Sequence, residues 1–127
     1  MLEVGSTVYI AGPMRGIRCF NFARFFYWQV VLEKSGYKVI NPAELDCLRW
    51  IETGWMFTED QYDEILDIDC KMIQESADCV FVLSGWQTSE GANREIRTAK
   101  DKGIMVAYED RSITGTDTKS VNPKEIK

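Results

Sequence analysis

The segment from Ser89 to Glu95 combines features that suit chemistry on a bound anion. Ser89 is a favoured N-cap residue, and the start of a helix offers free N–H groups and a positive dipole end to a phosphate. Gly91 and Glu95 are four residues apart and share a helix face, which Gly91 leaves uncovered. The spacing predicts that Glu95 stands beside a phosphate pocket. An ordinary surface helix with Glu95 in solvent fits the same spacing.

A second candidate is the loop Gly12-Pro13-Met14-Arg15-Gly16, which directly follows the apolar run 7–11. Its glycines allow close approach to the backbone, and the Arg15 guanidinium can bind two phosphate oxygens. A plain turn with a surface arginine is the alternative. Tyr9, inside the apolar run, is either a core tyrosine or a phenol that orients a catalytic carboxylate.

Further acids and aromatic residues are open candidates. Asp67, Asp69 and Asp78 precede or begin the apolar run 79–83, where acids usually cap helices or face solvent. One of them could supply a second catalytic carboxylate. Three tryptophans could stack on a base or close the core. They are Trp50, Trp55 and Trp86.

The composition excludes several mechanisms. The 127 residues include no histidine, so the chain cannot form a Ser-His-Asp or Cys-His site by itself. Four cysteines without a CxxC pair make a zinc site improbable, and we expect no metal or other cofactor. A net charge of −5 argues against nucleic-acid polymers and anionic membranes as partners. Without a signal peptide or a bilayer-spanning run, we expect a cytoplasmic protein with free cysteines.

Alternating strands and helices must position these residues. The order predicts an α/β, three-layer flavodoxin/Rossmann-like domain over 1–110, with a parallel central sheet of 4–5 strands and helices on both faces. Ligands bind such sheets outside the carboxyl ends of the strands, where the two candidate loops fall. Residues 111–127 are predicted to be a polar tail or docking arm. Strands are expected at 7–11, 37–40, 79–83 and 104–108, helices at 21–34, 58–77 and 89–102, and a short helix plus a loop at 43–58.

Together these motifs resemble the nucleoside 2-deoxyribosyltransferase superfamily over roughly residues 6–108. The resemblance rests on the run Val8 to Gly16, an Asp-bearing helix and Ser89-x-Gly91-x-x-x-Glu95. Asn41-Pro42-Ala43-Glu44 and Gly85-Trp86 are similar to a phage and bacterial branch that often has no assigned activity.

The resemblance implies a mechanism and catalytic residues. Glu95 would attack the anomeric carbon and expel the base, leaving a glycosyl-enzyme that water or a second base resolves. Tyr9 would hold Glu95. Asp69 would be the acid that serves the leaving base, although counting back from the strand start at Asp78 places Cys70 in that slot.

The resemblance also bears on substrate. Transferases of this superfamily tend to carry an acid at the position of Ser89, whereas a serine donates a hydrogen bond to phosphate. The chain is therefore most similar to the 2′-deoxynucleoside 5′-phosphate N-hydrolases, which release free base and deoxyribose 5-phosphate. Base exchange and a catalytically silent nucleotide-binding protein are the alternatives, and the base and the sugar, ribose or deoxyribose, stay open. The resemblance implies a homodimer or higher homo-oligomer with shared active sites, and a nucleotide site at Gly12, Met14, Arg15, Gly16, Ser89 and Gly91.

Overall fold

The computed structural model describes residues 2–53, 57–110 and 120–121. Its strands form a single sheet in the order β2-β1-β3-β4-β5, and every pair of neighbours is parallel. This confirms the predicted α/β class with a parallel central sheet. The strands are β1 (Thr7–Ala11), β2 (Lys38–Ile40), β3 (Cys79–Val82), β4 (Met105–Tyr108) and β5 (Ser120–Val121).

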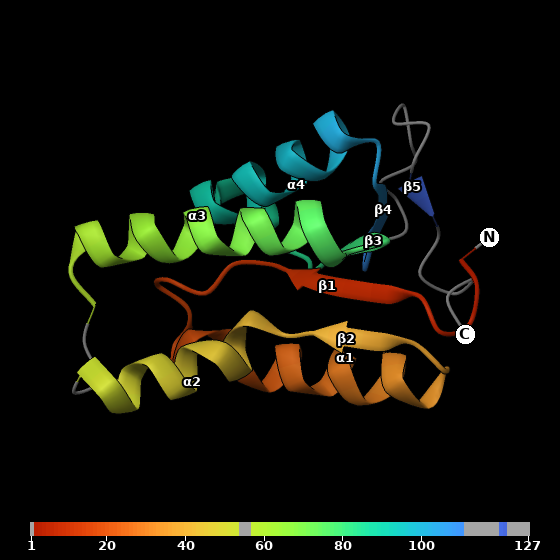
Figure 1. Ribbon diagram of the computed structural model, residues 1–127. Coiled ribbons are helices and arrows are strands. Elements are labelled where there is room, and N and C mark those ends of the chain that lie inside the picture. Colours follow the sequence, from red (N-terminus) through yellow and green to blue (C-terminus); the bar gives the residue numbers. More distant parts are fainter. Residues whose placement is uncertain (1, 54–56, 111–119, 122–127) are drawn as a thin grey trace.

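Helices cover both faces of the sheet and complete the three layers (Figure 1). One face packs against α1 (Phe22–Lys34) and α2 (Pro42–Thr53), and the other against α3 (Glu59–Ser76) and α4 (Glu90–Lys102). Two short 3₁₀ helices, η1 (Arg18–Asn21) and η2 (Trp86–Thr88), lie in the loops before α1 and α4.

Alternation along β1 assigns its side chains to two separate cores. Val8 and Ile10 pack with α1 residues, whereas Tyr9 and Ala11 pack with residues of α3 and α4. All four side chains are fully buried, because β1 lies between β2 and β3 and is covered on both faces. The period of two therefore places the Tyr9 ring on the side of α4.

Most predicted elements are found within one or two residues of their expected bounds. Thr58 begins α3 with a capping box, in which its side chain accepts from the Gln61 N–H while Gln61 caps in return. Ser89 caps α4, and Gly103 ends it in the left-handed conformation at φ 77°.

Two segments differ from the expectation. The stretch predicted as a short helix plus a loop contains α2, twelve residues long, because Asn41 caps its first turn and Pro42 opens it. In the polar tail, Ser120–Val121 forms β5 and pairs with β4; residues 111–119 and 122–127 lie outside the described part. Among the described residues, no helix is both long and apolar enough to cross a membrane.

Candidate functional site

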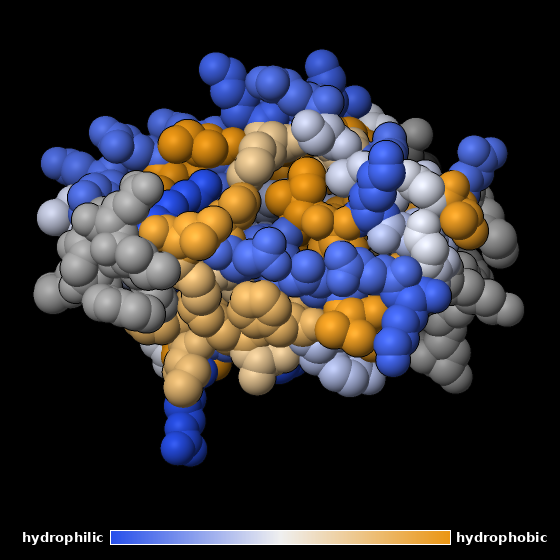
Figure 2. Space-filling view, turned by 60° about the horizontal axis from the view of Figure 1, so that its bottom comes forward, coloured by the Kyte–Doolittle hydropathy of each residue, from blue (hydrophilic) through white to orange (hydrophobic). Residues whose placement is uncertain are grey.

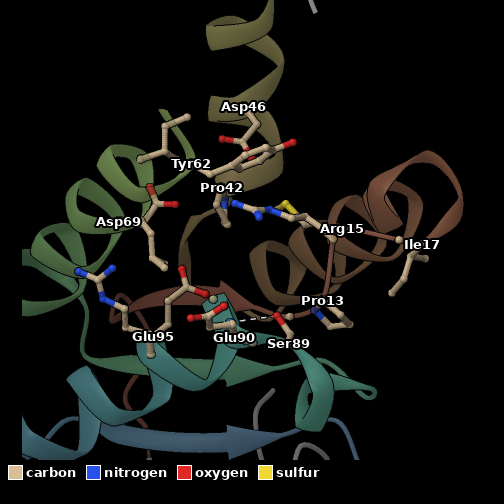
Figure 3. Close-up of a pocket in the computed structure, with 18 of the residues that line it drawn as sticks. Pro13, Arg15, Ile17, Pro42, Asp46, Tyr62, Asp69, Ser89, Glu90 and Glu95 are labelled. Carbon is tan, nitrogen blue, oxygen red and sulfur yellow. Dashed lines mark hydrogen bonds between the residues drawn. The ribbon is translucent and has the colours of Figure 1, made fainter. Parts of the chain in front are cut away.

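A cleft of about 550 Å³ lies at the carboxyl edge of the sheet, lined by both predicted loops and by α2, α3 and the start of α4 (Figure 3). Every predicted substrate-binding residue lines this cleft, and so do Asp69 and Glu95. Tyr9 lies directly behind the wall, in contact with Glu95. Strand order explains why the two predicted loops line one cleft. Because β1 and β3 are neighbours, the loops at their carboxyl ends leave the sheet side by side.

Glu95 is buried and does not face solvent, with 6% of its surface exposed. It lies in the second turn of α4, where the Tyr9 hydroxyl donates a hydrogen bond to Glu95 Oε2. The Gly91 face one turn earlier is open: a Cβ built there would meet only Leu66, at 3.8 Å. The spacing argument therefore correctly places Glu95 at the cleft beside the open Gly91 face, and the alternative of a surface helix with Glu95 in solvent is wrong.

Asp69 also lines the cleft and is coupled to both of these groups. Burial raises the pKa of Glu95 well above its usual range; the Asp69 charge raises it further, and the Tyr9 hydrogen bond opposes the rise. Burial likewise raises the pKa of Asp69 to about 6, against Arg49 and the Tyr9 hydroxyl. A negative charge on one carboxyl group makes ionisation of the other less favourable. Glu95 and Asp69 therefore favour a state in which the pair carries one proton.

The other candidate acids lie elsewhere. Asp67 pairs with Arg94 and is largely exposed. Asp78 accepts from the Thr7 N–H at the opposite edge of the sheet. Asp69 is thus the acid of the three that lines the cleft. Counting back from Asp78 placed Cys70 in the slot of this acid. Cys70 is buried and does not line the cleft, so no thiol takes the place of Asp69 at the cleft surface.

Two site residues on α2 were missed from the sequence. Arg49 donates to Asp46 Oδ1 at 2.7 Å and to Asp69 Oδ1 at 3.2 Å, which ties α2 to α3. Asp46 lines the cleft, whereas Arg49 does not. The spacing i, i+3 of Asp46 and Arg49 was the available signal, but it has meaning only once the segment is known to be a helix.

The opposite end of the cleft, called here the anion end, is formed by the start of α4. The Ser89 side chain accepts from the Ala92 N–H at 3.1 Å, and the Ser89 hydroxyl proton stays available to a ligand. The N–H groups of Glu90 and Gly91 have no acceptor in a preceding helical turn. The Asn93 amide fixes the loop by donating to the carbonyl groups of Trp86, Gln87 and Ser89.

Arg15 crosses the mouth of the cleft toward α3. Its guanidinium lies 3.3 Å from a Glu59 carboxylate oxygen and 3.5 Å from the centroid of the Tyr62 ring. Arg15 therefore sits at the cleft, as predicted, but is held by α3 residues. Since Arg15 and Glu59 are 52% and 86% exposed, this ion pair is weak and can be exchanged for a ligand.

Gly12 and Trp86 have structural roles that the sequence left open. A Cβ at Gly12 would lie 2.8 Å from Leu83 Cβ, so this glycine is required by the packing of the loop on β3. The carbonyl of the next residue, Pro13, accepts from the buried Asn21 amide at 3.0 Å. The Trp86 ring packs 5.6 Å from Tyr108 in the core beside α4. The side chains of Trp50 and Trp55 lie outside the described residues.

The fold and the cleft define a parallel α/β protein with a carboxylate pair at the carboxyl edge of its sheet. The chain belongs to the family described as "Domain of unknown function (DUF4406)", whose model matches residues 6–108. None of the curated proteins matches the chain significantly. Among the described residues, no group of three or more His, Cys, Asp or Glu side chains gathers to hold a metal ion.

Proposed function

We propose that the chain is an N-glycosidase of the nucleoside deoxyribosyltransferase type, which hydrolyses the N-glycosidic bond of a (deoxy)nucleoside 5′-monophosphate. The observation that carries this proposal is the buried Glu95, hydrogen-bonded to Tyr9 and coupled to Asp69 on the wall of an open cleft. The raised pKa values leave one proton on this carboxylate pair near neutral pH, and their order assigns it to Glu95 in the free protein. The reaction needs that proton on Asp69, so the proposed mechanism includes its transfer from Glu95 to Asp69 in the nucleotide complex.

In the first step Glu95 Oε attacks the anomeric carbon as the bond to the base nitrogen breaks. The bonding electrons go to the base, which takes the proton from Asp69. Positive charge develops on the sugar in the transition state and is stabilised by the Glu95 carboxylate. In the second step water attacks the glycosyl ester, Asp69 accepts a proton from this water, and Glu95 leaves as a carboxylate.

The charge distribution along the cleft supports one orientation of substrate. Asp46 on α2 and Asp69 on α3 form the inner wall, across the cleft from Ser89 (Figure 3). Glu95 lies on α4 between this wall and the anion end, which is formed by Ser89 and the first N–H groups of the same helix. A 5′-phosphate fits the helix start, and the base then extends toward the carboxylates. Arg15 can join the phosphate by releasing Glu59.

Exchange of bases on an unphosphorylated nucleoside is a second candidate, favoured by one observation. Three carboxylates, Glu59, Asp63 and Glu90, line the cleft in addition to those of its inner wall, and all three are exposed. Their field opposes a phosphate dianion and leaves a neutral nucleoside unaffected.

The test is release of free base from a panel of deoxynucleoside monophosphates and nucleosides, measured by chromatography. We expect release from the monophosphates and loss of activity in Glu95→Gln. Glu75→Gln, the same change at an exposed position of α3, is the matched control. Cleavage of nucleosides alone, or base exchange that outruns hydrolysis, would favour the second candidate. A bound nucleotide without any product would show a silent binding protein.

We also propose that two copies assemble so that each cleft is completed by its neighbour. Apolar side chains gather on the face of α1 and α2 (Figure 2), where Phe26, Val30 and Leu48 are 37%, 50% and 60% exposed. Ile17 continues this surface to the cleft, which it lines. Light scattering should give the mass of at least a dimer, and Val30→Glu should lower it. A monomer at working concentration would contradict this part of the proposal.

A further inference from the structure

The inner wall of the cleft also holds Asp46, a carboxylate that the proposed mechanism does not use. Asp46 lines the cleft beside Asp69, and its side chain is 10% exposed. Figure 3 shows both aspartates on the far side of the cleft from Ser89. The Asp69 charge raises the pKa of Glu95, and the Tyr9 hydroxyl lowers the pKa of both carboxyl groups. The Asp46 charge raises the pKa of both carboxyl groups, but Asp46 takes no part in the proposed proton transfers and can serve recognition.

Arg49 fixes the position of Asp46 and opposes the rise that burial causes in the pKa of this carboxyl group. Its guanidinium donates to Oδ1 of Asp46 from the same helix, one turn away, and reaches Asp69 with a second nitrogen. Arg49 does not line the cleft, so a ligand meets the carboxylate and not the cation. A carboxylate accepts up to about four hydrogen bonds, and the described contacts give Asp46 the single donor Arg49.

The chemistry of an ionised carboxylate determines what it can recognise. It accepts hydrogen bonds and donates none, so it attracts an amino group and repels a carbonyl oxygen. Cytosine and adenine carry an exocyclic amino group on the edge far from the sugar, whereas uracil and thymine carry a carbonyl oxygen there. With phosphate at the anion end, this edge of the base points away from Ser89, toward the wall that holds Asp46.

We propose that Asp46 is a specificity-determining residue that selects bases with an exocyclic amino group, of the cytosine or adenine type, over uracil and thymine. This inference rests on the proposed function, because it assumes that a nucleotide occupies the cleft with its base at the inner wall. Two observations support this role: Arg49 positions Asp46, and Arg49 is not among the residues that line the cleft.

The experiment compares dCMP with dUMP, which carry an amino group and a carbonyl oxygen, respectively, on the base edge far from the sugar; the adjacent ring nitrogen is an acceptor in cytosine and an N–H donor in uracil. We expect the wild-type protein to cleave dCMP with a kcat/KM about 10- to 100-fold higher than dUMP. This is the range expected when a buried acceptor faces another acceptor and loses its hydrogen bond. Asp46→Asn, whose amide can also donate, should reduce this ratio to about threefold or reverse it. Glu44→Gln, the same kind of change at an exposed position of α2, should keep the ratio.

Calorimetry separates failure of this inference from failure of the proposed function. The Glu95→Gln variant should bind dCMP more tightly than dUMP, and adding Asp46→Asn should remove the difference. Equal cleavage of both nucleotides by the wild-type protein overturns the inference and leaves the function intact. A binding preference for dCMP without base release supports the role of Asp46 and refutes the hydrolase. Absence of both binding and cleavage refutes both.

Discussion

Replacement of Asp69 by Asn tests how strongly the fold opposes charge on the cleft wall. Burial raises the pKa of Asp69 from 3.8 to about 6. The folded protein therefore binds more protons than the unfolded chain between these values. Stability from this group is fully present below pH 3.8 and is lost as the pH rises through 6.

The shift from 3.8 to about 6 corresponds to about 3 kcal/mol of unfolding free energy in all. About 1.4 kcal/mol of this is lost between pH 5 and pH 8. The Asp69 side chain is 7% exposed, so solvent screening does not reduce the figure much. An asparagine does not titrate, and its presence also removes one of the charges that raise the pKa of Glu95.

Urea unfolding of dilute protein, followed by tryptophan fluorescence at pH 5 and pH 8, measures the effect. The wild-type protein should lose at least about 1.4 kcal/mol more stability than Asp69→Asn over this interval. The Asp69→Asn variant lacks the Asp69–Arg49 ion pair at both pH values, and in the wild-type protein the effect of Arg49 is already part of the Asp69 pKa. The difference between the two changes in stability therefore measures the titration of Asp69 together with its effect on Glu95. If the two pH profiles run parallel, Asp69 has an ordinary pKa and the coupled pair does not exist.

Two further predictions concern packing and the hydrogen bond to Glu95. Gly12→Ala should lower the free energy of unfolding by about 1–3 kcal/mol, because the new Cβ would overlap Leu83. Gly91→Ala should change it by less than about 1 kcal/mol, because its Cβ would have space. Equal losses of stability in thermal unfolding would refute this contrast. Tyr9→Phe should raise the pKa of Glu95 further, because it removes a hydrogen bond that lowers it, and should shift the acidic limb of the pH–rate profile upward. An unchanged limb would mean that Tyr9 has a packing role alone.

The sequence was sufficient for the architecture because its signals are local. Apolar runs, helix caps at Thr58 and Ser89, and Gly103 each depend on a few neighbouring residues. The contact between Tyr9 and Glu95 follows from two sequence patterns. Side chains alternate between the two faces of β1, and residues four apart, such as Gly91 and Glu95, share a face of α4. The sequence pattern alone left it open whether Glu95 was buried, and the packing of α3 against α4 decided it.

The parts that could not be predicted depend on contacts between distant elements. Arg49 binds Asp69, twenty residues further along the chain, as well as Asp46, and no local sequence pattern predicts this bridge. The direction of Arg15 is set by Tyr62 and Glu59 on another helix. The reason for the glycine at position 12 is likewise a contact with a distant strand end.

A covalent bond between Glu95 and the sugar can be trapped by acid quenching during turnover of a deoxynucleoside monophosphate. Peptide mapping by mass spectrometry should find a deoxyribose phosphate ester on the peptide that contains Glu95, and on no other peptide. Free base that accumulates over the time course while this peptide stays unmodified would contradict the account.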